Sequence, residues 1–234
     1  MKTIILPRQE LLRKAADEIC AVFREKPDAA VTMAVGRTML PLWELLGETV
    51  REGKLSMKEA RFFQTAEFLD APAACSLQEM TEQHLLACTD LDPEHCFWLS
   101  DYADCPEDYD AALQNAGGLD LAVLGLGDNA HIGLNEPPVP FDTRTGIRKL
   151  TKDTRNQYAW LFGNAGQAPE KACTMGIRTL TEAKKIMVLC LGEKKAQATF
   201  SMLYARTDGL VPAAYLQLPY DVTVYADLEA GEKL

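Results

Sequence analysis

Short apolar runs alternate with longer amphipathic segments along the first part of the chain. The runs Thr3–Leu6, Ala30–Val35 and Ala60–Thr65 predict buried strands. Between them, Gln9–Arg24 and Thr38–Glu52 have the apolar spacing of helices. This order of elements is typical of a parallel sheet with helices packed on its faces.

The rest of the chain continues this alternation less regularly. Segment 66–88 is polar, irregular at its start and helical toward its end. We therefore predict an α/β fold with a Rossmann-like parallel sheet and flanking helices. The further elements expected are strands at Leu119–Leu124, Ile186–Leu191 and Val222–Tyr225, and helices at Glu107–Asn115, Lys194–Arg206 and after Thr151.

The length and composition fit one domain that spans residues 1–234. The chain has 234 residues, 47% of them hydrophobic, which is enough for one sizeable core. We find no internal repeat, low-complexity segment or linker. In open parallel sheets, ligands collect at the carboxyl ends of the strands, so chemistry is expected just after Val35, Thr65, Leu124 and Leu191.

The net charge of the chain excludes some classes of binding partner. The chain carries 34 acidic and 24 basic residues, a formal net charge of -10, which disfavours nucleic acid and anionic membranes. An anionic small substrate would need a local basic pocket. No apolar run reaches the roughly 18 residues that span a bilayer, and the N-terminus is unlike a signal peptide, so we expect a cytoplasmic protein. The cysteines lack any CxxC pair and are expected to be reduced thiols: Cys20, Cys75, Cys88, Cys96, Cys105, Cys173 and Cys190.

The segment after Leu124 concentrates polar side chains at the end of a buried strand. Two glycines, Gly125 and Gly127, allow a sharp turn that presents backbone amides to a ligand. His131 is followed five residues later by Glu136, which suits an acid–base imidazole oriented by a carboxylate. The alternative is a solvated loop with a structural histidine.

These residues carry a family resemblance. GGLDLAVLGLGDNAHIGLNEP resembles the signature of the glucosamine-6-phosphate deaminase/isomerase family and looks closest to its galactosamine-6-phosphate branch. The family pattern is a strand, then Gly-x-Gly, then Asn-Asp-Gly-His or a variant, then Asn-Glu-Pro. The resemblance extends through DTRTGIRKLTKDTRNQ and CTMGIRTLTEAKKIMVLCLGEKKAQA, and so covers nearly the whole chain.

The resemblance implies a reaction and roles for its residues. The family opens the ring of a 2-amino-2-deoxyhexose 6-phosphate, moves a proton from C2 to C1 and releases ammonia, as an isomerase and hydrolase without metal or cofactor. His131 matches the family's ring-opening histidine, and Glu136 its orienting glutamate. Asn129 stands where the family has an aspartate, so we expect a lower pKa for His131 than in a typical member.

The proton-abstracting carboxylate of the family has no counterpart in this sequence. The family supplies it from an Asp-Glu pair after the third strand, where this chain reads FFQTAEFLDAP. With Glu67 on the glutamate of the pair, Ala66 takes the place of the basic aspartate. Glu67 points to the opposite side of an extended segment. Glu67 or Asp70 would replace the base only after a rearrangement of the loop.

The resemblance also implies a phosphate site. Gly36, Arg37 and Thr38 fall at the start of a helix, where free amides bind anions, and Thr38 alternatively serves only as its N-cap. Lys195 matches the family's phosphate lysine. An arginine that some deaminases place after the DTR segment falls at Trp160, so one phosphate contact is expected to be lost. Some family members have an allosteric phosphate site built from a segment with two arginines. Arg144 matches one of these arginines, but Gly146 stands in place of the other, so this site is not expected here.

Three functions remain in competition. The first is an amino-sugar-phosphate deaminase/isomerase, to which we assign the chain. The second is a sugar-phosphate-binding or regulatory protein that has lost turnover, which Ala66, Asn129 and Trp160 favour. A 6-phosphogluconolactonase is disfavoured, because QTAEF lacks the Asp-Glu-Arg expected there, and a dinucleotide site is rejected because GLGDNA lacks the third glycine. The epimer of the substrate and homo-oligomerisation stay open.

Overall fold

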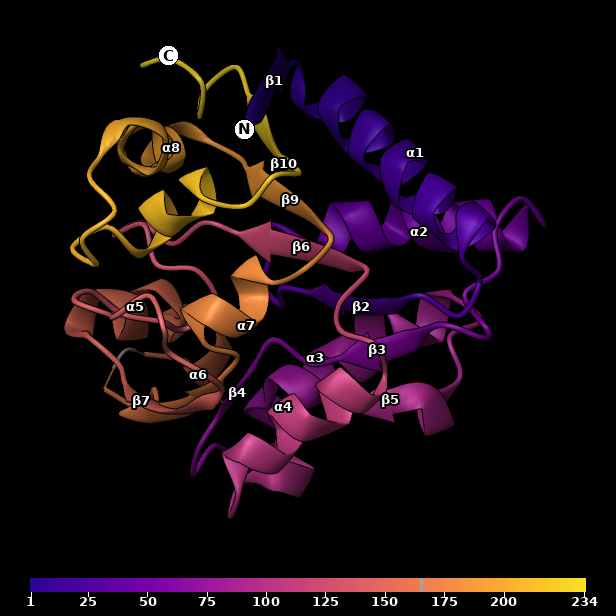
Figure 1. Cartoon of the computed structure of the whole chain (residues 1–234), viewed down its shortest axis with the longest axis horizontal. Helices are drawn as coiled ribbons and strands as arrows, with labels where there is room; N and C mark the ends of the chain where they lie inside the picture. The colour runs from indigo at the N-terminus through magenta and orange to yellow at the C-terminus, as the bar shows by residue number, and fades with distance from the viewer. Residues whose placement is uncertain (165) are drawn as a thin grey trace.

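The computed structural model describes residues 1–164 and 166–234. Its main sheet has seven strands in the order β1-β10-β9-β6-β2-β3-β5, and every pair of neighbours is parallel (Figure 1). This confirms the predicted parallel α/β fold. The strands are β1 Lys2–Leu6, β2 Ala30–Met33, β3 Arg61–Phe63, β5 Cys96–Phe97, β6 Leu121–Gly125, β9 Lys185–Cys190 and β10 Val222–Asp227.

Helices cover both faces of this sheet. Alternate residues of a strand point to opposite faces, so Leu121 and Val123 of β6 join one buried cluster while Ala122 and Leu124 join another. Helices α1 and α2 pack in the first cluster, and α4 and α8 in the second (Figure 1). The helices are α1 Arg8–Glu25, α2 Leu40–Arg51, α3 Leu77–His84, α4 Pro106–Asn115, α5 Lys152–Gln157, α6 Ala159–Phe162, α7 Ile177–Thr181 and α8 Ala196–Tyr204.

A second, three-stranded sheet was not predicted from the sequence. It consists of β4 Ala66–Phe68, β8 Lys171–Thr174 and β7 Gly146–Lys149, with antiparallel neighbours in the order β4-β8-β7. These strands are three or four residues long, and β7 alternates half-buried and exposed positions, so no apolar run marks them. The predicted strand Ala60–Thr65 ends at Phe63, and the next strand begins at Ala66.

Helix α2 begins later than expected, which leaves a loop at the carboxyl end of β2. The N-cap of α2 is Met39, and no side chain caps it. The alternative role of Thr38 as an N-cap is therefore wrong, because the helix starts at Leu40. Residues 34–39 instead form a loop between strand and helix.

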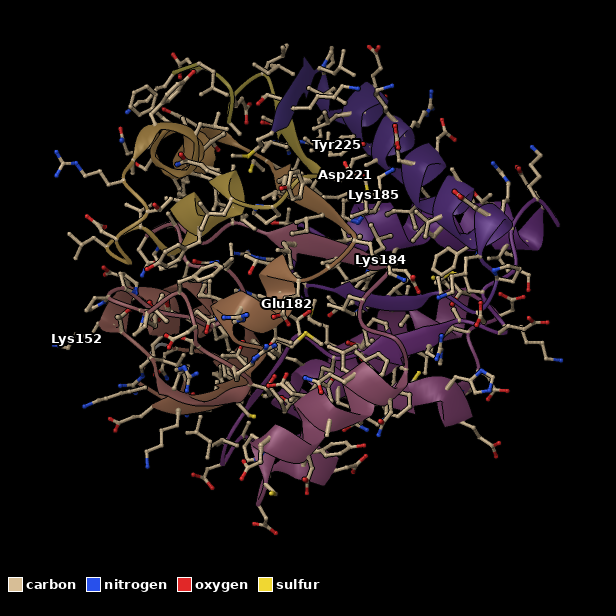
Figure 2. The ribbon with its side chains drawn as sticks, viewed as in Figure 1. Lys152, Glu182, Lys184, Lys185, Asp221 and Tyr225 are labelled. Carbon is tan, nitrogen blue, oxygen red and sulfur yellow. The ribbon has the colours of Figure 1, made fainter. Side chains whose placement is uncertain are left out.

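Ion pairs at the start of β9 tie this central strand to its surroundings. Lys185 Nζ lies 2.8 Å from Glu18 Oε2 on α1, and Lys184 Nζ lies 2.7 Å from Asp120 Oδ1 at the entrance to β6. The two lysines are adjacent at the entry to the strand (Figure 2). In the described residues, no helix is both long enough and apolar enough to cross a membrane.

Candidate active site

A cavity of about 820 Å³ opens at the carboxyl edge of the main sheet. Its walls come from the loops after β2, β3, β6 and β9, the four strand ends that the sequence singled out, with further residues from Arg8 and from segment 153–160. Parallel strands bring these loops together, although more than a hundred residues separate the first from the last. The cavity therefore contains most of the predicted site residues.

His131 reaches this cavity as the inner end of a hydrogen-bond relay. Its side chain is buried, and Nδ1 lies 2.7 Å from Asn129 Oδ1. Asn129 Nδ2 donates to Glu136 Oε2 at 2.8 Å. The backbone N–H and the hydroxyl of Thr151 donate to Glu136 Oε1 at 3.1 and 3.2 Å. Glu136 thus holds His131 through Asn129, which corrects the expected direct contact between glutamate and histidine.

The relay fixes the tautomer of His131. A carboxylate only accepts hydrogen bonds, so Asn129 must turn its amide nitrogen to Glu136 and its oxygen to the imidazole. His131 Nδ1 therefore carries the proton and donates it to Asn129. Across residues 1–164 and 166–234, no group hydrogen-bonds Nε2, and this nitrogen keeps its lone pair for a ligand.

Burial keeps the His131 imidazole neutral. Desolvation is the main cause that lowers its pKa to about 4, and the charge of Lys195 acts in the same direction. Glu136 and Asp128 oppose this shift because their negative charges favour the imidazolium. The expected effect of Asn129, a lower pKa than in other family members, stays a prediction, because the shift in this structure is caused by burial and by Lys195.

Gly127 makes room for the imidazole. A Cβ atom at this position would lie 2.3 Å from His131 Cε1 and Nδ1, which no side chain tolerates. The turn that follows is closed by hydrogen bonds of 2.9 Å from Gly127 N to His131 O and from Ala130 N to Gly127 O. Ala130 adopts the left-handed conformation there, with φ of 61°. The predicted importance of Gly127 thus has a steric basis beside any amide contact.

Glu67 does not reach the cavity. Among the described residues that line it, Ala66 is present and Glu67 and Asp70 are not. The buried carboxylate of Glu67 accepts hydrogen bonds from Gln64 Nε2 and from the backbone N–H groups of Phe68, Leu77 and Gln78, at 2.8 to 2.9 Å. It therefore anchors the start of α3.

This arrangement corrects the sequence interpretation of Glu67 and Asp70. A carboxylate with four donors is neither a solvated loop residue nor positioned as a base in this cavity. Asp70 is exposed in a turn with φ of 61°. Ala66 is 4% exposed and contributes a methyl group to the wall where the resemblance places a carboxylate.

The predicted phosphate residues all line the cavity, and we call the part of the lining that they form its rim. Gly36, Arg37 and Thr38 line it from the loop before α2, and Lys195 lines it from the turn before α8. The guanidinium carbon of Arg37 lies 5.1 Å from the ring centroid of Trp160, a cation–π contact. The two departures from the family pattern at this rim therefore touch each other.

Some groups at the rim were not predicted. Lys195 forms an ion pair with Asp128, so its charge is partnered by a carboxylate of the same chain. Arg8 also lines the cavity, and its guanidinium lies 2.8 Å from Asp227 and 3.1 Å from Glu229. Thr154 Oγ1 lies 3.3 Å from His131 Nδ1. Contacts across such long stretches of sequence leave no local signal in it.

The cavity lining has a small excess of basic side chains, although the protein as a whole is acidic. Arg8, Arg37, Lys194 and Lys195 line the cavity, against the carboxylates Asp128, Asp153 and Glu193. An anionic substrate in a chain of net charge -10 would have to rely on this small local excess of positive charge. Over the described part of the chain, no group of three or more His, Cys, Asp and Glu side chains is placed to hold a metal ion.

Arg144 lies outside this cavity. Its Nη2 donates to Glu182 Oε1 at 2.8 Å, and Glu182 also accepts from Arg178 at 2.9 Å. Glu182 directly follows α7 as its C-cap residue and is labelled in Figure 2. Arg144 is therefore partnered by a carboxylate.

Comparisons with known proteins place these features in a family. The model of the family described as glucosamine-6-phosphate isomerases/6-phosphogluconolactonase matches residues 7–225. A glucosamine-6-phosphate deaminase of Halalkalibacterium halodurans is 35% identical over 228 residues, covering 94% of this chain and 92% of that protein. Glucosamine-6-phosphate deaminase 2 of Giardia intestinalis is 32% identical over 240 residues, covering 100% and 91%.

Solved structures agree with this result. A monomeric glucosamine-6-phosphate deaminase superposes with a TM-score of 0.92 at 29% identity, over the whole of both chains. The 6-phosphogluconolactonase of Leishmania guyanensis has a TM-score of 0.77 at 18% identity, covering 100% of this chain and 98% of that one, a likeness of fold alone.

The fold and the cavity define an α/β enzyme with a buried histidine in the wall of a cavity at the carboxyl edge of its parallel sheet. The chain belongs to the family of glucosamine-6-phosphate isomerases and 6-phosphogluconolactonases. The family resemblance found in the sequence is thereby confirmed at this level.

Proposed function

We propose that this protein is an amino-sugar-phosphate deaminase/isomerase, which converts glucosamine 6-phosphate or galactosamine 6-phosphate to a ketose 6-phosphate and ammonia. The observation that carries the proposal is the relay Glu136–Asn129–His131, which presents a neutral imidazole at the wall of the cavity. The names of the similar deaminases support the same reaction. Galactosamine specificity rests only on the sequence motif.

His131 is proposed to open the sugar ring. Its Nε2 accepts the proton of the anomeric hydroxyl and returns a proton to the ring oxygen, while Nδ1 stays bonded to Asn129. Asn129 and Glu136 are positioning residues in this proposal, because they fix the tautomer of His131.

The phosphate is proposed to bind between Lys195 and the loop of Gly36, Arg37 and Thr38. Lys195 supplies a point charge once the phosphate displaces Asp128, and Arg37 supplies a planar fork of donors. Trp160 supports the guanidinium of Arg37 from one side. In this proposal, Arg37 contributes the second phosphate contact in place of an arginine at position 160.

The methyl group of Ala66 favours a second candidate function. A protein with this cavity and no carboxylate at position 66 would bind sugar phosphates as a sensor or regulator without turnover. A 6-phosphogluconolactonase has less support, since its similarity to this chain is one of fold. The single-domain organisation over residues 1–234 and the cytoplasmic location remain predictions, and the oligomeric state remains open beside a monomeric structural relative.

The test is release of ammonia together with ketose 6-phosphate from glucosamine 6-phosphate and galactosamine 6-phosphate. We expect slow turnover by the wild type and an increase of at least about 100-fold in Ala66→Asp, because general-base catalysis contributes about 10² to 10⁴. Ala66 lines the cavity, so the new carboxylate would reach a bound sugar. Ala66→Asn is the matched control, since it has nearly the same shape without the charge.

The outcomes separate the candidate functions. Turnover that depends on His131 and rises in Ala66→Asp but not in Ala66→Asn supports the deaminase. If neither the wild type nor Ala66→Asp turns over either sugar phosphate, while both proteins still bind them, the result supports the sensor. Hydrolysis of 6-phosphogluconolactone in their place would identify a lactonase.

A further inference from the structure

The cavity contains one part of the acid–base machinery without the other. His131 presents Nε2 with its lone pair available. Glu67 and Glu136 are already occupied, by four and three donors. Of the carboxylates that line the cavity, Asp128 is held in an ion pair with Lys195, and Asp153 and Glu193 come from the segments that supply Trp160 and Lys195. At position 66 the wall presents a methyl group.

These groups suit a reaction that moves protons only between oxygens. Opening a hexopyranose removes the proton of the hydroxyl at C1, forms the C1=O1 double bond, breaks the bond between C1 and the ring oxygen O5, and protonates O5. O1 and O5 are both attached to C1, so one imidazole nitrogen can serve both in turn. Removing the proton at C2 instead requires a base over the carbon skeleton, which Ala66 cannot provide.

We propose that the cavity interconverts the α and β anomers of hexose 6-phosphates, including sugars with a hydroxyl group in place of the amine at C2. His131 Nε2 takes the proton from O1 and gives it to O5, and C1 and C2 rotate about their bond in the open aldehyde. The reverse steps then close the ring on the other face, so no proton or electron is gained or lost overall. The inference rests on the sugar-phosphate site proposed above but not on deamination.

The relay prepares His131 for use in both directions. Asn129 accepts the Nδ1 proton and is itself locked by Glu136, so the ring cannot change its tautomer without breaking two hydrogen bonds. Gly127 lies against the ring, where a Cβ atom would overlap it. With Nδ1 engaged, Nε2 is the nitrogen left to act as a neutral base that becomes an acid after one transfer.

The experiment measures anomer exchange directly. Proton exchange spectroscopy on the anomeric signals of glucose 6-phosphate and glucosamine 6-phosphate gives the interconversion rate with and without protein. We expect a rate proportional to protein concentration with both sugars, and a loss of at least about 100-fold in His131→Gln. His84→Gln is the matched control, because His84 is exposed on α3 and does not line the cavity.

A second variant tests the positioning role of the relay. Asn129→Leu removes the acceptor of the Nδ1 proton, and we expect a lower exchange rate with unchanged binding of inorganic phosphate. The pH profile adds a readout that a purely structural role would not move. The wild-type rate is expected to stay level from pH 8 to pH 6 and to fall as the imidazole protonates, and Asn129→Asp shifts this fall to higher pH.

The results distinguish this inference from the proposed deamination. Anomer exchange without ammonia release keeps the inference and overturns the deaminase. Ammonia release without accelerated exchange of glucose 6-phosphate overturns the inference and keeps the deaminase. Exchange at the protein-free rate, while both sugars bind, also overturns it, as does exchange that survives in a folded His131→Gln variant.

Discussion

At the scale of single residues, the hydrogen-bond partner of His131 is a neutral amide, that of Asn129. A carboxylate at this position would make the imidazole more basic. Asn129 Oδ1 contacts both the ring and the backbone N–H of His131, at 2.7 and 3.2 Å. The amide holds the ring without stabilising its charged form. The identity of residue 129 therefore controls the pH at which His131 becomes charged.

Asn129→Asp is expected to raise the pKa of His131 by about one unit or more, because a carboxylate beside Nδ1 stabilises the imidazolium. The measurement is a titration of the imidazole signals by nuclear magnetic resonance. Asn164→Asp adds the same charge at an exposed position and should leave the titration unchanged. An unchanged midpoint in Asn129→Asp would contradict the hydrogen bond to Nδ1.

The buried imidazole also makes folding sensitive to acid. The folded pKa of His131 is about 4, below its ordinary value of 6.5, so the unfolded chain binds more protons between these values. The contribution of His131 to the free energy of unfolding is therefore constant above about pH 6.5. It falls as the pH drops toward 4, by up to about 3 kcal/mol.

His131→Gln is expected to remove this contribution. Urea unfolding at pH 7 and pH 4 should show a smaller loss of unfolding free energy in the variant than in the wild type. The difference between the two proteins isolates His131 from carboxylates that titrate in the same range. Equal losses would mean that the imidazole is solvated in the folded protein.

The sequence predicted the residues of this relay but not its order. Gly127, His131 and Glu136 stand out because a glycine turn, a histidine and a glutamate follow one buried strand. Asn129 as the direct partner depends on how the turn closes, which the residue types do not reveal. Strand alternation predicted that Glu67 points away from the side of Ala66, and the cavity lining includes Ala66 and not Glu67. The backbone donors from Leu77 and Gln78 that hold its carboxylate had no local signal.

At the scale of elements, the close approach of two backbone segments restricts which residue type fits at a position, as packing in the hydrophobic core does. Gly176 caps the start of α7, where a Cβ atom would lie 2.1 Å from Thr143 O and 2.5 Å from the carbonyl of Arg144. Backbone atoms cannot move aside as the end of a flexible side chain can. The helix thus packs against segment 143–144 only with glycine at this position.

Gly176→Ala is expected to lower the unfolding free energy by about 2–3 kcal/mol, because the overlap forces α7 away from its neighbour. The midpoint of urea unfolding measures this loss. Gly36→Ala is the matched control for stability, since a Cβ atom there meets nothing within 4 Å. Equal midpoints for the two variants would contradict the packing at α7.

Long, strongly patterned elements were predicted well, and short ones were not. Helix α1 and strand β9 follow their apolar spacing to within one or two residues. Helices α6 and α7 and the strands of the second sheet have six residues or fewer, and tertiary contacts decide their conformation. Such elements lack the repeated period on which sequence prediction depends.

At the scale of the whole molecule, the last strand is an interior strand of the main sheet. Strand β10 lies between β1 and β9, and all six of its residues are buried. Strand β1 is an edge strand, and its residues are exposed or half-buried. The two ends of the chain, which lie near each other in Figure 1, therefore differ in their importance for folding.

Deletion of residues 222–234 is expected to abolish cooperative unfolding, because it removes the partner of two strands and the buried Tyr225. Deletion of residues 1–6 should lower the thermal midpoint and leave one cooperative transition. Differential scanning calorimetry compares the two. A cooperative transition after the C-terminal deletion would show that the sheet closes without β10.

The contact of Arg37 with Trp160 gives the molecule an optical property of its own. Of the three tryptophans, Trp43 and Trp98 are 0% and 9% exposed, whereas Trp160 is 39% exposed and lies under a guanidinium at the rim of the cavity. Indole emission depends on nearby charge and solvent, so an anion that draws Arg37 away from the ring changes the emission of Trp160 selectively. Fluorescence of the unlabelled protein therefore reports occupancy of the rim even where no product is formed.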